Sequence, residues 1–244
     1  MPDLPPGWTL HRHGTVASTN DLAVGLADQG ASEGTIVLAE AQSAGRGRGG
    51  RSWVSPVGNL YCSVVLRPTD QMPQAANLSF VIAVALRAAI VSAIGPTGAQ
   101  LKWPNDILIN GAKVSGILLE AGRDSIIAGT GVNVVENMGQ GSSPGATLIA
   151  HNPSATADAL LHLYIAELDR RLQIWRREGF APIRREWLDH GIGLGEPIVA
   201  RTGQDTLEGV FETLDPNGAL ILRQPGGTTS TILAADVFFP AGAA

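Results

Sequence analysis

The sequence predicts an α+β protein in which a mixed β-sheet flanked by helices is followed by a small β-barrel. Up to about residue 194, β-branched runs that fit strands alternate with longer segments that have the apolar spacing of helices. From Gly195 onward the composition changes to short strands separated by turn sequences, such as Asp215-Pro216-Asn217-Gly218 and Gly226-Gly227. We therefore expect a body over residues 1–194 and a barrel over residues 195–244.

The first part of the body is predicted to contain three strands and one helix. Ser18 is a good N-cap and Asp21 stands three residues later, which predicts a helix that ends near Gly30. The strands are expected at Trp8–Val16, Thr35–Ala41 and Asn59–Leu66. Cys62 lies among apolar residues in the last of these strands, so we interpret it as a small buried hydrophobe and not as a nucleophile.

The middle of the body begins with the longest apolar run, Ala75–Ile94. Polar residues interrupt the run, and Pro73 and Gly95 flank it, which favours a buried helix over a membrane span. Strands are expected at residues 101–103, 106–110 and 125–135, and the Asn110-Gly111 pair predicts a hairpin turn just before Lys113. A long amphipathic helix should then run from Pro153–Ser154 to Gly179, followed by a shorter one over Pro182–His190.

Composition excludes several classes of protein. The net charge of −5 and the pI near 5.5 argue against a general nucleic-acid binder, so no DNA partner is expected. The single cysteine excludes an intramolecular disulfide, and the first residues lack a signal peptide. We expect a cytoplasmic protein without a membrane partner.

The run from Gln42 to Trp53 is the most informative stretch, because glycines alternate in it with Arg46, Arg48 and Arg51. Backbone N–H groups that can approach a ligand closely thus stand beside permanent positive charges, which predicts an anion site. The spacing matches G-x-G-x-x-G, but no helix start follows it, and no P-loop motif occurs in the chain. A flexible basic loop that contacts RNA is the alternative interpretation of this stretch alone.

Three further blocks accompany this loop: Ser18-Thr19-Asn20, Lys102-Trp103-Pro104-Asn105-Asp106 and Lys113-Val114-Ser115-Gly116-Ile117-Leu118-Leu119-Glu120. Each also has a purely structural interpretation, as a helix cap, a proline turn and an edge strand with a solvated lysine. In this order, however, the four blocks resemble a biotin protein ligase from about Thr15 to the C-terminus. The resemblance implies ATP-dependent attachment of biotin to a lysine of a carrier protein, a class II aminoacyl-tRNA synthetase-like body and an SH3-like barrel.

The resemblance also implies roles for individual residues. Lys113 and Arg48 would be catalytic, and Asp106 is a candidate ligand for Mg²⁺. The biotin site would comprise Ser18, Thr19, Asn20, Gln42, Gly45, Arg46, Gly47, Arg48, Lys113 and Gly116. The ATP site would comprise Arg48, Arg51, Trp53, Asn105, Asp106, Lys113 and Asn133. The implied partners are biotin, ATP and the biotin carboxyl carrier domain of a biotin-dependent carboxylase. A homodimer is a further expectation, although the sequence does not specify the oligomeric state.

Two features differ from the common pattern of the resembled family. Gly49 stands where the family often has another arginine, so the loop carries less positive charge. Only 17 residues precede Ser18, too few for the DNA-binding repressor half that some biotin ligases carry. Attachment of lipoate or octanoate is the alternative activity, because those enzymes share the fold and a catalytic lysine. We also predict that residues 45–51 are poorly ordered without ligand.

Overall fold

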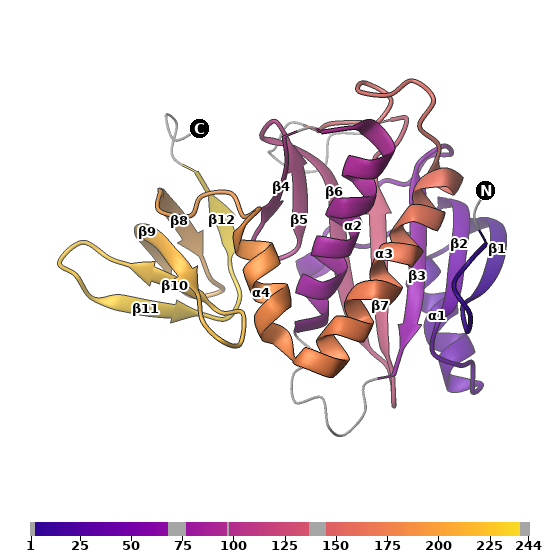
Figure 1. Cartoon of the computed structure of the whole chain (residues 1–244), viewed down its shortest axis with the longest axis horizontal. Helices are drawn as coiled ribbons and strands as arrows, with labels where there is room; N and C mark the ends of the chain where they lie inside the picture. The colour runs from indigo at the N-terminus through magenta and orange to yellow at the C-terminus, as the bar shows by residue number, and fades with distance from the viewer. Residues whose placement is uncertain (1–2, 68–76, 97, 137–144, 240–244) are drawn as a thin grey trace.

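A computed structural model describes residues 3–67, 77–96, 98–136 and 145–239 of the chain. Its body is a seven-stranded mixed sheet with the strand order β1-β2-β3-β7-β6-β5-β4, in which β1 runs parallel to β2 and the other neighbours are antiparallel. The strands are β1 (Thr9–Val16), β2 (Thr35–Gln42), β3 (Leu60–Leu66), β4 (Ala99–Lys102), β5 (Asp106–Ile109), β6 (Ala112–Ala121) and β7 (Ile126–Val132). The predicted mixed sheet is confirmed (Figure 1).

Helices cover the two faces of this sheet unequally. The long helices α2 (Leu78–Ile94) and α3 (Ala157–Glu178) lie side by side on one face, where alternate strand residues such as Ile36 and Val64 join the main core. Helix α1 (Thr19–Asp28) packs on the opposite face through a second, smaller apolar cluster that includes Ala23 and Val65. Because α1 covers only part of its face, room remains beside its N-terminus.

The N-termini of α1 and α3 have side-chain caps, and two helix starts differ from the sequence prediction. Ser18 caps α1 as expected, with its hydroxyl accepting from the Asp21 N–H. Helix α3 begins at Ala157 and not at Pro153–Ser154, because Thr156 is its N-cap and the Ser154 N–H instead donates to the Asn152 side chain. Helix α4 (Phe180–Leu188) begins two residues before the predicted start, since a proline in the first helical turn has no N–H to satisfy.

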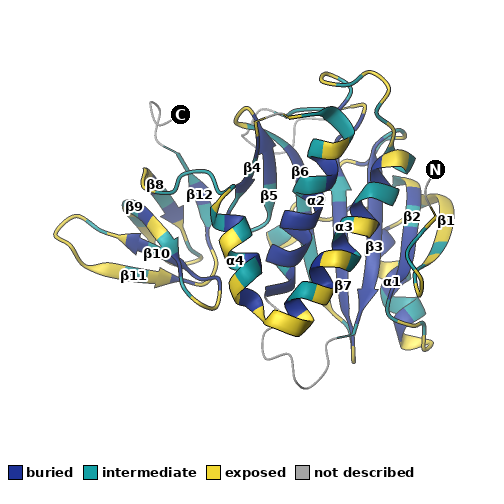
Figure 2. Cartoon of the chain, viewed as in Figure 1, coloured by how far each residue is buried: buried dark blue, intermediate teal, exposed yellow. Residues whose placement is uncertain are grey.

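The predicted hairpin and the predicted buried helix are confirmed. Asn110 and Gly111 both have positive φ, 50° and 78°, as a tight turn between antiparallel strands requires. Helix α2 is largely buried where it packs against the sheet and beside α3, as Figure 2 shows. No helix in the described part of the chain is both long enough and apolar enough to cross a membrane. Cys62 is fully buried, and burial raises the pKa of its thiol to about 12, which fits the predicted structural role.

The C-terminal part is a five-stranded antiparallel sheet that packs beside α4 and the β4 edge of the body. Its strands are β8 (Pro197–Arg201), β9 (Thr206–Leu214), β10 (Leu220–Arg223), β11 (Thr229–Ile232) and β12 (Asp236–Phe238). Trp187 of α4 packs against Phe211 of this sheet, with the rings tilted by 53° and their centroids 6.4 Å apart, and Trp103 of the body donates to the Gly218 carbonyl. The small β-domain predicted after residue 194 therefore has a firm contact with the body.

Candidate active site

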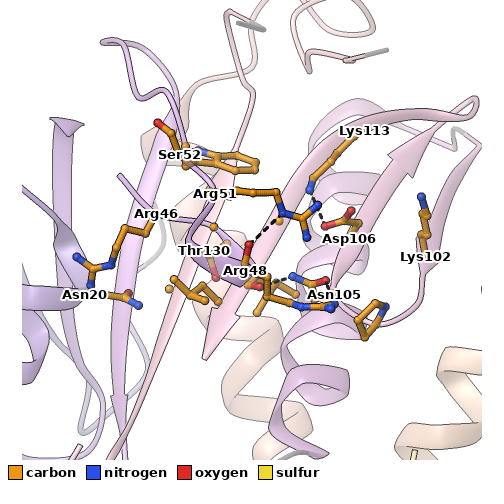
Figure 3. A pocket seen from close by; sticks show the side chains of 18 of the residues that line it. Asn20, Arg46, Arg48, Arg51, Ser52, Lys102, Asn105, Asp106, Lys113 and Thr130 are labelled. Atoms are coloured by element: carbon orange, nitrogen blue, oxygen red, sulfur yellow. Dashed lines mark hydrogen bonds and ion pairs between the residues drawn. The ribbon is translucent and has the colours of Figure 1, made fainter. Parts of the chain in front are cut away.

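A cavity of about 200 Å³ opens on the α1 face of the sheet, beside the N-terminus of α1. Figure 3 shows side chains from the glycine-arginine loop (residues 45–51) and from the sheet pointing into it. Thirteen of the fifteen residues that the sequence predicted for the biotin and ATP sites line this cavity: Ser18, Thr19, Asn20, Gln42, Arg46, Gly47, Arg48, Arg51, Trp53, Asn105, Asp106, Lys113 and Gly116. The fold thus gathers the four sequence blocks at one place.

Glycines on the strands create the floor of this cavity. A Cβ added to Gly129 would lie 2.3 Å from the Asn20 side chain, and one added to Gly131 would lie 2.6 Å from the Trp53 ring. At Gly116 the same atom would lie 3.0 Å from Trp53 and 3.4 Å from the Lys113 ammonium. Any larger side chain at these three positions would push the lining groups out of place.

The α1 end of the cavity is built from the cap of the helix. The N–H and hydroxyl of Thr19 both donate to Gln42 Oε1, at 2.8 and 3.0 Å. Ser63 of β3 donates to the Asn20 side-chain oxygen at 2.5 Å, and Asn20 donates to Glu120 at 2.5 Å. The Ser18-Thr19-Asn20 block therefore caps α1 and also presents fixed polar groups to the cavity.

Arg46 is held by carboxylates at this same end. Its guanidinium donates to both oxygens of Asp21, at 2.9 and 2.6 Å, and also to Glu120 at 3.2 Å. The hydrogen bonds from Arg46 lower the pKa of Asp21. Arg46 lines the cavity as predicted, but its positive charge is already balanced and it acts as a link between the loop and α1.

The loop itself turns back on its own backbone. Arg48–Gly50 form a short 3-10 turn, and the Gly47 N–H donates to the Arg51 carbonyl at 2.7 Å. Gly49 has a φ of 65°, a left-handed conformation that favours glycine. The replacement of an arginine by Gly49, noted in the sequence, therefore suits the local backbone.

Arg48 and Arg51 connect the loop to the C-terminal domain. Arg48 donates to Asn105 Oδ1 at 3.0 Å and to the Ala235 carbonyl at 3.2 Å, while Arg51 pairs with Asp236 at 2.9 Å. Burial lowers the pKa of Arg48, although a guanidinium keeps its charge at any physiological pH. Strand β12 of the small domain thus forms one wall of the cavity.

Lys113 and Asp106 form an ion pair in the lining of the cavity, with Nζ and Oδ1 2.7 Å apart (Figure 3). Both side chains are about one-fifth exposed, at 22% and 21%. Asp106 comes from β5 and Lys113 from β6, and the Lys113 ammonium also lies 5.4 Å from the centroid of the Trp53 ring. The pairing fixes the position of the Lys113 ammonium within the cavity lining.

The structure places two predicted site residues outside the cavity lining. Gly45 packs under the loop, where an added Cβ would lie 2.4 Å from the Trp53 carbonyl. Asn133 is buried, and its backbone bonds to Val114 and Leu148. Among the described residues no cluster of three or more His, Cys, Asp or Glu side chains could hold a metal ion, so Asp106 is a single carboxylate candidate.

Sequence reasoning did not assign several residues that line the cavity. They are Ser52, Lys102, Trp103, Pro104, Ile117, Leu118, Gly129, Thr130, Gly131, Asp236, Val237 and Phe238. Six of these residues, 52, 102–104, 117 and 118, belong to the sequence blocks that resemble the ligase family. Membership of a block was therefore the signal that could have identified them. Asp236 and Phe238 arrive from the C-terminal domain, and no local pattern marks them.

Most of the chain matches models of known protein families. Residues 15–137 match the model described as the Biotin/lipoate A/B protein ligase family, and residues 193–239 match the biotin protein ligase C-terminal domain. The chain belongs to this family. The sequence prediction of the family and of its fold is confirmed.

Individual relatives cover nearly the whole chain. A curated biotin–[acetyl-CoA-carboxylase] ligase of Paracoccus denitrificans is 45% identical over 91% of this chain and 97% of its own length. The bifunctional ligase/repressor BirA of Bacillus subtilis is 34% identical over 95% of this chain and 74% of its own length. The solved biotin protein ligase of Aquifex aeolicus, in complex with biotin and ATP, has a TM-score of 0.83 and 26% identity, covering 94% of this chain and 97% of that one.

Proposed function

We propose that this chain joins biotin to one lysine of a biotin carboxyl carrier domain at the expense of ATP. The observation that carries the proposal is the Lys113–Asp106 ion pair, which lies in a cavity whose wall also holds Arg48 and Arg51. The curated relative that is 45% identical has this activity in its name, and the similar Aquifex structure contains biotin and ATP.

In the first half-reaction the carboxylate of biotin acquires a good leaving group. The biotin carboxylate oxygen attacks the α-phosphorus of ATP, the bond to the bridging oxygen breaks, and pyrophosphate leaves with the electron pair. The other product is biotinyl-5′-adenylate. Both reactants are anions, so the main task of the protein is to position them and to balance their charge.

Lys113 is the residue we assign to this task. Its ammonium can move from Asp106 to the reacting oxygens with only a small change, because the two groups already meet inside the cavity. Arg48 reaches the same space from the loop, where Asn105 and the Ala235 carbonyl fix its guanidinium. Uncharged polar groups of Thr19, Asn20 and Gln42 at the α1 end suit the ureido ring of biotin.

Magnesium fits the donor set of this site. Mg²⁺ usually takes one or two protein carboxylates and completes its shell with phosphate oxygens and water. Asp106 supplies one carboxylate that lines the cavity, with Asn105 beside it. When bound, the ion would neutralise phosphate charge, and Asp106 is the residue that would hold it.

In the second half-reaction the amine of the carrier lysine attacks the carbonyl carbon of the adenylate. An amide forms, the bond to phosphate oxygen breaks, and AMP leaves while the amine loses a proton. The adenylate must be shielded from water until the carrier arrives. The glycine-arginine loop, fastened to α1 by Arg46 and to the small domain by Arg51, is placed to provide that cover.

The test is a coupled measurement of pyrophosphate release and of carrier modification. Purified protein with Mg-ATP and biotin should release pyrophosphate, and addition of a carrier domain should yield one biotinylated lysine and AMP. The same assay with lipoate and octanoate should show little turnover. Turnover with lipoate but not with biotin would overturn the proposal.

Two finer expectations belong to the same proposal. The expected homodimer can be tested by analytical ultracentrifugation with and without biotin and ATP. The cytoplasmic location can be tested by fractionation of cells that express a tagged chain.

A further inference from the structure

Lysine is rare in this chain, and its placement is informative. Of the 17 basic side chains only two are lysines, Lys102 and Lys113, and both line the cavity. Every other basic position is an arginine. Lysine differs from arginine by its compact ammonium, which binds a phosphate as a point charge. The function proposed above uses Lys113 and leaves Lys102 without a role.

Lys102 differs from the other cations of the cavity in its partners. Arg46, Arg48, Arg51 and Lys113 each contact at least one carboxylate. The Lys102 ammonium makes no hydrogen bond or ion pair with any residue in the described part of the chain. It lies instead 5.9 and 5.5 Å from the ring centroids of Phe238 and Phe239.

An ammonium in such a position is costly without an anion. Lys102 is partly buried, and this burial lowers its pKa, with Lys113 and Arg51 adding to the effect while Asp106 and Asp236 oppose it. The aromatic rings offset part of the free energy lost on desolvation, but they carry no net negative charge. A phosphate beside Lys102 would supply the missing charge.

The position of Lys102 in the sheet indicates which phosphates these are. Lys102 of β4 pairs in register with Asp106 of β5, and Asp106 pairs with Gly116 of β6. Strand β4 is the edge of the sheet nearest the small domain (Figure 1), whereas the groups suited to biotin stand by α1 across the sheet. Lys102 therefore lies beyond Lys113, farther from the biotin end of the cavity.

We propose that Lys102 binds the pyrophosphate portion of ATP, and that strand β12 of the small domain completes this subsite. The inference rests on the proposed function. When the carboxylate of biotin attacks the α-phosphorus, the leaving oxygen carries the electron pair away on pyrophosphate. The Lys102 ammonium balances the charge that develops there, and Phe238 lines the cavity beside it.

The test compares binding of inorganic pyrophosphate, ATP, AMP and biotin to three variants by titration calorimetry. Lys102→Met should weaken binding of ATP and pyrophosphate roughly tenfold or more, the usual loss for a charged hydrogen bond. AMP and biotin should bind as they do to the unmodified chain. Lys102→Arg keeps the charge and should recover part of the affinity.

Arg201→Met is the matched control. The Arg201 guanidinium stacks on the same Phe238 ring at 4.6 Å, but Arg201 does not line the cavity. This variant removes an equal charge that lies near the same ring and should bind all four ligands normally. Equal losses in the Arg201 and Lys102 variants would indicate a general effect of charge and overturn the assignment.

A measurement on the intact protein avoids the risk that a variant misfolds. Reductive ¹³C-methylation labels just two lysines and the N-terminus, and the Lys102→Arg variant identifies the Lys102 signal. Pyrophosphate should shift that signal and raise the pKa read from its titration, whereas biotin alone should not. A Lys102 signal that pyrophosphate leaves unchanged would contradict the proposal.

The outcomes separate this inference from the function on which it rests. If the unmodified chain fails to bind biotin and to release pyrophosphate, the proposed function is wrong. If it does both and Lys102→Met binds pyrophosphate as tightly as the unmodified chain, only the role of Lys102 is wrong.

Discussion

The Lys113 ammonium and the Asp106 carboxylate lie 2.7 Å apart, on neighbouring strands that line the cavity. The ion pair stabilises the charge of a lysine that lies inside a cavity. An unpartnered lysine inside the cavity would lose part of its hydration, whereas a permanently buried pair would have little affinity for substrate. Both side chains remain about one-fifth exposed. The carboxylate can therefore hold the ammonium in place while the ammonium stays accessible to a second anion.

Replacement of Lys113 is expected to abolish adenylate formation. Lys113→Ala removes the central positive charge, and single preorganised donors of this kind contribute about 10²–10³-fold in rate. The rate of pyrophosphate release should fall by at least that factor, while the circular dichroism spectrum and the melting temperature change little. Near-normal adenylate synthesis by this variant would disprove the catalytic role.

Asp106→Asn tests the other half of the pair. The variant keeps the shape of the side chain but loses the charge, so Lys113 is held less firmly and the expected Mg²⁺ ligand is weakened. We expect slower adenylate formation and a higher Mg²⁺ concentration for half-maximal rate. Glu120→Gln is the control, because its carboxylate pairs with Arg46 at the α1 end. An unchanged Mg²⁺ dependence in Asp106→Asn would exclude the metal role.

The sequence predicted the site better than it predicted the contacts within it. Blocks separated by up to about 90 residues resembled one family, so their meeting in one cavity followed from the fold. The pairing of Arg46 with Asp21 was not predictable, because it depends on where the loop crosses α1. Asp236 could not be predicted as a site residue for a similar reason, since only docking of the small domain brings it to Arg51.

Element boundaries show the same limit on a smaller scale. Ser154 and Thr156 are both capable of capping a helix, and the sequence pattern does not choose between them. The choice depends on Asn152, whose side chain accepts from the Ser154 N–H and delays the helix start. Competition between local hydrogen bonds of similar strength decides such boundaries.

The absence of a side chain at Gly131 is expected to favour nucleotide binding. A Cβ at this position would lie 2.6–2.8 Å from three atoms of the Trp53 indole, so Gly131→Ala must displace the ring. Overpacking of this kind typically costs about 1–3 kcal/mol, and the KM for ATP should rise roughly tenfold as the wall of the cavity moves.

Gly14→Ala is the matched control for that change. Gly14 lies on β1 of the same sheet, and a Cβ added there meets nothing within 4 Å. The control variant should keep the normal KM for ATP. If Gly131→Ala also keeps it, the position of the Trp53 ring has no part in nucleotide binding.

The bidentate pair between Arg46 and Asp21 is expected to hold the loop closed. Asp21→Asn weakens this link, so trypsin should cut after the loop arginines faster than in the unmodified chain, and biotin with ATP should slow the cutting. Asp28→Asn, at the other end of α1, is the control and should leave the cutting rate unchanged. Equal rates of cutting with and without ligands would refute the predicted ordering of residues 45–51.

The ion pair between Arg46 and Asp21 should weaken as the pH falls. Arg46 lowers the pKa of Asp21, so the contribution of the pair is present at neutral pH and is lost as the pH falls through that lowered value. Asp21 is 54% exposed, and solvent therefore keeps the effect on global stability small. The local effect is measurable by hydrogen exchange of the loop amides, corrected for the intrinsic pH dependence. The unmodified chain and Asp21→Asn should differ at pH 7 and converge only as the pH falls through the lowered pKa of Asp21, which lies below the ordinary aspartate value of about 3.9.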